Sequence, residues 1–112
     1  MADTFKILGQ AALAATTSTA VYTVPSTPAG ISATISSVVI CNRGTTSCTF
    51  RLSTAIAGAV LANAQYIYYD QPLDPNSTFI ATLGITLAST DVIRAYASTA
   101  NVSVNIYGVE VT

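Results

Sequence analysis

The two cysteines have the widest choice of chemistry in this 112-residue chain. Six residues separate Cys41 from Cys48, a spacing open to a disulfide, a redox pair or half of a metal site. The chain has no His and no further Cys, so a tetrahedral zinc site would need carboxylates from elsewhere. We therefore expect two reduced thiols buried in the core, with a cross-strand disulfide as the alternative.

The carboxylates offer little for acid–base catalysis, which needs paired titratable groups. Asp70, Asp74 and Asp91 all lie in turn-like segments, where Asp usually bonds its own backbone. A loop calcium site built from Asp70, Asp74 and Asn76 is the weaker alternative. Serine is plentiful, but without His no ordinary nucleophile–base pair can be drawn. We predict a non-enzymatic protein with no catalytic residues, no cofactor and no metal.

The composition predicts a protein of assemblies. Four Lys or Arg and five Asp or Glu make 8% of the chain, whereas a soluble domain carries about a quarter charged residues. The net charge of −1 excludes the basic footprint of a nucleic-acid or membrane-surface protein. We expect no signal peptide, because Asp3 lies in what would be its positive region and Gln10 interrupts the apolar stretch, and no transmembrane segment, because no apolar window approaches about 18 residues. A surface of hydroxyl and methyl groups is suited to being covered by other subunits.

Short runs of β-branched and aromatic residues, separated by turn residues, predict seven or eight strands. We predict an all-β fold, an antiparallel β-sandwich or jelly-roll-like domain over 18–112, preceded by an N-terminal arm over 1–17. The Ala-rich stretch 7–15 is the only helix candidate, and its Thr-rich tail favours an extended arm equally. On a free subunit we expect the arm to be mobile, and in an assembly to lie along a neighbour. The predicted strands are 19–24, 31–42, 48–53, 65–70, 78–83, 92–98 and 102–111.

A two-residue turn at 44–45 would set the register of one hairpin. Residues whose numbers sum to 89 would then face each other on the core side. The predicted facing pairs are Cys41 with Cys48, Val39 with Phe50, and Ser37 with Leu52.

The opposite side of the first of these strands is also apolar, which predicts burial on both sides. We predict a subunit interface over it, with a long loop of the same subunit as the alternative. Aromatic residues are enriched at interfaces, and two tyrosines would point outward if Ile67 and Tyr69 point inward. The candidate interface residues are Val38, Ile40, Tyr66 and Tyr68.

Charges are rare within the predicted strands. The predicted strands contain the charged residues Arg51, Arg94 and Glu110. Charged residues on strands are more often part of a solvated face. The alternative is that they pair across subunits of an assembled particle, where breaking a desolvated pair is costly.

Five segments recur together in a known family, and the resemblance covers nearly the whole chain from about residue 5. In their order they resemble the small virion structural proteins of tailed bacteriophages, cyanophages among them. The resemblance implies a capsid, neck or tail location and brings no catalytic residues. The segments are Val21-Tyr-Thr-Val-Pro25, Ser37-Val-Val-Ile-Cys-Asn-Arg-Gly44, Tyr66-Ile-Tyr-Tyr-Asp70, Gly84-Ile-Thr-Leu-Ala-Ser-Thr-Asp91 and Val102-Ser-Val-Asn-Ile-Tyr-Gly-Val-Glu110.

Four functional hypotheses follow. The leading one is a virion protein that forms a symmetric oligomer, a homotrimer, and decorates or cements the capsid by contacts with itself and with the major capsid protein. The second places it on the neck, tail, fibre or baseplate, in contact with tail proteins. In the third, Tyr66 and Tyr68 bind host-surface carbohydrate. The weakest is a cellular pilus-like subunit. None involves nucleic acid or a membrane.

Overall fold

The computed structural model describes residues 3–27 and 30–112, so part of the predicted turn before Gly30 lies outside the described residues. Strands dominate, which confirms the predicted all-β class. The elements are β1 (Asp3–Ala12), β2 (Thr19–Thr23), β3 (Ser32–Asn42), β4 (Cys48–Ala55), the 3-10 turns η1 (Ile56–Gly58) and η2 (Asn63–Gln65), β5 (Tyr66–Leu73), β6 (Thr78–Ala81), β7 (Ile85–Leu87), β8 (Val92–Ala97) and β9 (Val102–Val111).

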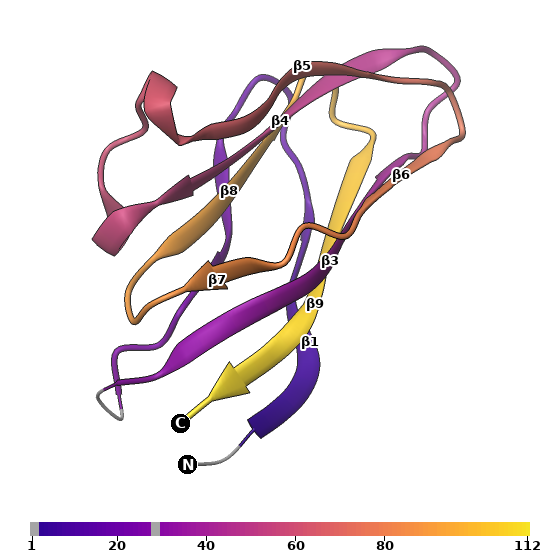
Figure 1. Cartoon of the computed structure of the whole chain (residues 1–112). Coiled ribbons are helices and arrows are strands. Elements are labelled where there is room, and N and C mark those ends of the chain that lie inside the picture. Colours follow the sequence, from indigo (N-terminus) through magenta and orange to yellow (C-terminus); the bar gives the residue numbers. More distant parts are fainter. Residues whose placement is uncertain (1–2, 28–29) are drawn as a thin grey trace.

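Two antiparallel sheets pack face to face (Figure 1). Sheet A has the order β1-β9-β3-β6, with β7 also pairing with β3, and sheet B has the order β2-β8-β4-β5. The pairs are nested: the first strand pairs with the last, β2 with β8, β3 with β6 and β7, and β4 with β5. A long hairpin rolled up on itself gives this order, which is the jelly-roll form of the β-sandwich.

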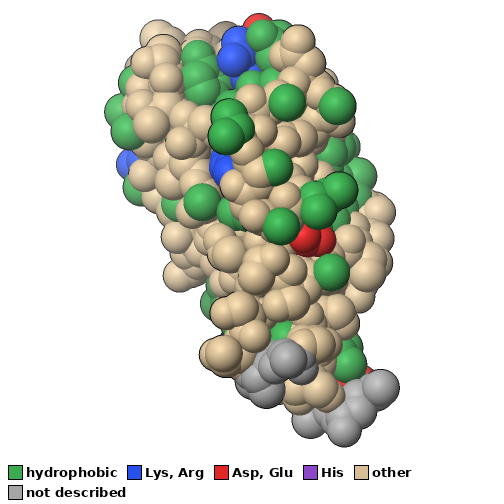
Figure 2. Space-filling view, turned by 90° about the vertical axis from the view of Figure 1, so that its left-hand side faces the viewer, with side chains coloured by type: hydrophobic (Ala, Val, Ile, Leu, Met, Phe, Trp, Pro, Cys, Tyr) green, Lys and Arg blue, Asp and Glu red, His purple; other side chains and the backbone are tan. Residues whose placement is uncertain are grey.

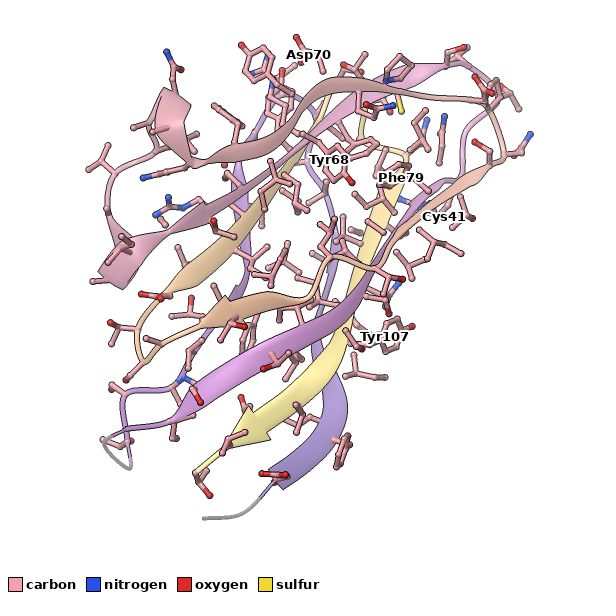
Figure 3. All side chains as sticks on the ribbon, viewed as in Figure 1. Cys41, Tyr68, Asp70, Phe79 and Tyr107 are labelled. Carbon is pink, nitrogen blue, oxygen red and sulfur yellow. The ribbon has the colours of Figure 1, made fainter. Side chains whose placement is uncertain are left out.

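One hydrophobic core fills the space between the sheets. Every second residue of a strand points into this core, as the alternating burial along β3, β8 and β9 shows. Near the β5–β6 border the rings of Phe50, Tyr68 and Phe79 contact one another, with centroids 5.0–5.9 Å apart. Tyr68 and Phe79 point between the sheets in Figure 3.

The predicted hairpin between β3 and β4 is wrong. The two strands lie in different sheets, so the segment after Asn42 crosses the end of the sandwich and does not turn back on itself. Phe50 and Leu52 are buried as predicted, whereas Ser37 and Val39 lie on the outer side of sheet A and are only half-buried. The inner side of β3 is the alternate set of residues, because its partners are β9, β6 and β7.

Asn42 holds this crossing in place. Its side chain is fully buried, and its amide nitrogen donates to the carbonyl oxygens of Thr46, Leu73 and Asp74 at 2.9, 3.3 and 3.1 Å. Its side-chain oxygen accepts from the Gly44 amide at 2.9 Å. These bonds satisfy buried backbone groups where the β3–β4 and β5–β6 connections pass each other. A polar residue at the end of an apolar strand is thus a structural node of the fold.

The N-terminal arm is a second correction. Residues 3–12 form β1, which pairs with β9 along its length apart from one bulge. Leu13 is 2% exposed, and Ala15 makes a parallel bridge with Ala97. The segment therefore belongs to the sandwich, and no boundary separates 1–17 from 18–112 within the described part. Only the pairing with β9 identifies this segment as an edge strand of sheet A.

Candidate interaction surfaces

Two residues of the predicted interface lie in the core. Val38 and Ile40 are 0% and 1% exposed within the single subunit, so the prediction that another chain covers them is wrong. The error follows from the hairpin register, because that register assigned the inner face of β3 to Val39 and Cys41.

The two predicted interface tyrosines point to opposite sides of sheet B. Tyr68 packs inward on Phe50, which contradicts its predicted exposure. Tyr66 lies on the outer side, where its ring meets that of Tyr69 at 84° with centroids 4.8 Å apart. Tyr69, predicted to point inward, is 57% exposed.

The two cysteines are free and lie in different sheets. Cys48 is 6% exposed, as predicted for a core thiol, and burial raises the pKa of its thiol. The same prediction is wrong for Cys41, which is half-buried on the outer side of β3 and points away from the core in Figure 3.

The outer face of sheet A is broad and nearly free of charge. Its residues follow from the strand registers, and they are exposed or half-buried. Asp3, at the border of the face, is the only charged residue that the described registers place on this side. The face consists of Phe5, Ile7, Gln10, Ala12, Ser32, Thr34, Ser37, Val39, Cys41, Thr78, Ile80, Thr86, Ser103, Asn105, Tyr107, Val109 and Val111.

Large apolar side chains lie across this face. Phe5, Ile7 and Ile80 are 80%, 52% and 65% exposed, and Tyr107 projects from β9 between the two borders. Phe5, Ile7 and Ile80 each keep more than half of their surface exposed, so no loop of the described chain covers them. Burying these side chains and their hydroxyl-bearing neighbours against another surface would desolvate almost no charge.

The outer face of sheet B is covered in part by the chain itself. Residues 56–65, named the covering loop here, contact β4 and β8, and Ser53, Ala55 and Val92 of these two strands are each at most 4% exposed. The Asp91 carboxylate accepts from the Ala57 amide in this loop and from the Ala88 amide of its own turn, both at 2.9 Å. The prediction that Asp91 stabilises a turn is confirmed.

Arg94 lies beneath the covering loop. Its guanidinium donates to the Gly58 carbonyl oxygen at 3.4 Å, and its Nη1 is buried without a partner among the described residues. On the side of the molecule that lies at the left of Figure 1, the hydrophobic side chains lie in separate groups among mostly tan atoms, with few charged atoms (Figure 2).

Beside the loop, sheet B carries four aromatic and cationic side chains in a line, the tyrosine row: Tyr96, Arg51, Tyr69 and Tyr66. The guanidinium carbon of Arg51 lies 4.3 Å from the Tyr96 ring centroid and 4.2 Å from that of Tyr69. Asp70 fixes it with two hydrogen bonds of 2.7 and 3.3 Å, which raise the pKa of Arg51 further. The row is therefore a preorganised cation–π arrangement on one face.

A bulge at Ile67 brings Tyr66 and Tyr69 to the same side, and β5 has a second bulge at Tyr69 and Asp70. Tyr69 and Asp70 together oppose the single residue Arg51, and Ile67 is an extra residue between the pairs of Tyr68 and Tyr66. Strict alternation would place residues three apart on opposite sides. Asp70 takes a left-handed φ of 50° at the bulge, which Asp tolerates better than most residues. Bulges often re-aim side chains beside functional sites, and no alternation pattern reveals them.

The third charged group, Glu110, links the sheets from the inside. Its carboxylate pairs with the Lys6 ammonium at 2.8 Å and accepts from the Tyr22 hydroxyl at 2.6 Å. Those two contacts, Lys6 first, lower the pKa of Glu110, while burial and the carboxylate raise the pKa of Tyr22. Glu110 is 8% exposed, so it does not lie on a solvated face as predicted. Its partners are in the same chain, so the alternative of a pair between subunits does not describe it either.

No group of three or more His, Cys, Asp or Glu residues that could hold a metal ion occurs in the described ranges, 3–27 and 30–112. None of the described helical segments is long and apolar enough to cross a membrane. Comparison of the chain with protein-family models, curated proteins and solved structures finds no match. The two outer sheet faces are therefore the features of the molecule from which a function can be inferred.

Proposed function

We propose that this chain is a non-enzymatic structural protein of a tailed-phage virion. It forms a symmetric oligomer, a homotrimer, on the exterior of the particle and acts as a capsid decoration or cement protein. The low charge, the jelly-roll topology and the resemblance of the strand segments all support this. Jelly rolls are common in viral capsid proteins, although they also occur in lectins and enzymes, so the fold alone carries no function.

The observation that carries the proposal is the outer face of sheet A. Interface cores are depleted of charged residues and enriched in aromatic ones, and this face has that composition. The molecule measures 45 × 27 × 20 Å, so a sheet face can supply the roughly 800 Å² per partner of a standard interface. A face of this composition gains from being covered by copies of itself and by other virion proteins.

Function then means adhesion. Each subunit contact is weak, but a symmetric array binds the particle at many points at once, and the effective concentration of each further contact is high. Bridging adjacent capsomers in this way opposes the outward pressure of packaged DNA. A sandwich with one core and nested strand pairs is a rigid body suited to transmit such a load.

The number of copies in each particle distinguishes the capsid from other locations. Hundreds of copies fit a decoration protein, whereas a few to some dozens fit a collar, fibre or baseplate component. The experiment is quantitative mass spectrometry of purified particles from cells expressing the gene, with the major capsid protein as internal standard. Absence of the chain from the particles overturns the proposal. A stoichiometry of a few dozen moves it to the neck or tail.

A further inference from the structure

The corner between Tyr66 and Tyr69 has the features of a ligand site. An open hollow of about 330 Å³ is lined by these two rings and by Asn63 of the covering loop. The rings stand at 84° to each other, so they form two walls of different orientation. Cavities of this size lie within the range that small ligands occupy in proteins.

The polar groups around the hollow are unused. In the described part of the chain, the Asn63 side-chain amide and the hydroxyls of Tyr66 and Tyr69 have no hydrogen-bond partner. They therefore offer donors and acceptors at the rim of an aromatic surface. Tyrosine combines an apolar ring with such a polar group at low cost in conformational entropy.

The site is also held rigid before any ligand binds. The Arg51 guanidinium supports the Tyr69 ring at 4.2 Å from its centroid, and Asp70 anchors that guanidinium. Gln65 holds the covering loop through the Val60 carbonyl oxygen at 2.9 Å and the Ala62 amide at 3.2 Å. Preorganisation of this kind reduces the entropy lost on binding.

Charge identifies the class of ligand. Among the described residues, the cation in contact with these rings is Arg51, and its bidentate pair with Asp70 neutralises it, so the rings carry no surplus charge for an anion. A sugar ring has a face of C–H groups and a rim of hydroxyls, which match a tyrosine ring and an amide. We propose that Tyr66, Tyr69 and Asn63 bind a neutral pyranose unit of a glycan. This site does not depend on assembly of the protein into particles.

The test is an NMR titration of the full chain with neutral oligosaccharides of glucose, galactose, mannose and N-acetylglucosamine, beside sialylated and uronate-containing ones. At least one neutral oligosaccharide should shift the Tyr66 and Tyr69 ring signals and the Asn63 side-chain amide. Affinity on the order of 1 mM is sufficient for detection. No binding by any neutral oligosaccharide, tighter binding of the acidic ones, or shifts confined to other residues overturns the proposal.

Substitutions at the site provide a second test of the proposal. Tyr69→Ala should weaken binding roughly tenfold or more, because one aromatic wall is lost. Tyr107→Ala, on the outer face of sheet A, removes the same ring elsewhere and should leave affinity unchanged. Since Tyr69→Ala also removes a contact of Arg51, Asn63→Ala is the variant that leaves the fold intact, and it should weaken binding as well. Wild-type affinity in both Tyr69→Ala and Asn63→Ala overturns the assignment.

Discussion

The outer faces of the two sheets differ in their charge and in how far the rest of the chain covers them. Sheet B carries Arg51 and Arg94, and the chain covers or neutralises both with the loop 56–65 and with Asp70. Sheet A carries no charge on the corresponding side away from its border, and nothing in the described chain covers it. The face with charges is covered or neutralised within the subunit, while the apolar face stays open in the single chain.

The comparison separates two kinds of recognition on one small domain. An uncharged face with exposed apolar side chains favours broad contact with another protein surface, since little desolvation cost opposes it. A rigid tyrosine row with free hydroxyls favours a small polar ligand. Four predictions test this difference, from the largest expected effect to the smallest.

Deleting residues 2–12 removes one border of the sheet A face and should unfold the domain. β9 would lose one of its two partners along almost its whole length, and Glu110 would keep a buried charge without Lys6. We expect a loss of more than about 4 kcal/mol, a large part of a typical domain's stability. Far-ultraviolet circular dichroism and urea unfolding measure it. A truncated chain with the wild-type midpoint would show that β1 is only an appended arm.

Ile80→Asp should abolish oligomer formation and leave the subunit folded. Ile80 is 65% exposed in the single chain, so the carboxylate is solvated there and desolvated only in the assembly. A cost of several kcal/mol corresponds to more than about a hundredfold weaker association, measured by sedimentation. The matched control is Ala20→Asp on the outer face of sheet B. Equal behaviour of the two variants would remove the distinction between the faces.

Glu110→Gln should cost about 2 kcal/mol, the range for buried hydrogen bonds to a charged group. The lowered pKa of Glu110 means that its contribution is present above the unfolded value, roughly 4.3, and is lost as pH falls through the folded pKa. Wild type should therefore lose stability in acid more steeply than the variant. Urea midpoints at neutral pH and at successive acidic values test this, and parallel curves would contradict it.

Asp70→Asn should change stability by less than about 1 kcal/mol, because the pair with Arg51 is on the surface and its carboxylate side chain is 44% exposed. Asn also tolerates the left-handed backbone at this bulge. The same urea measurement beside Glu110→Gln compares an exposed with a buried ion pair directly. A loss equal to that of Glu110→Gln would mean that the tyrosine row stabilises the fold as well as presenting a surface.

Much of the strand layout could be predicted from the sequence. The spans of β2, β3, β4, β8 and β9 agree with the predicted runs within one or two residues, because turn residues bound them sharply. The core residues Phe50 and Leu52 and the buried Cys48 thiol were likewise predictable from alternation. The short strand β7 was missed, since three residues do not make a detectable pattern.

The side of the sheet on which each residue lies was not predictable in the same way. The bulge at Ile67 put Tyr66 and Tyr69 together on the outside, and the cross-over after Asn42 exchanged the inner and outer sides expected for β3. Each error comes from a pairing partner far along the chain. A one-residue slip reverses every side chain, so a single wrong partner exchanges core and surface.

The sequence by itself determined an all-β domain with few charges, no His and apolar strands. These properties depend on composition and on local alternation, which any fold of the chain must respect. Only the tertiary structure decided that β1 closes the sheet beside β9, that Val38 and Ile40 form core, and that sheet A keeps an uncharged face open. Those outcomes depend on pairings between residues up to about a hundred positions apart, as between Thr4 and Glu110, and a local pattern does not encode them.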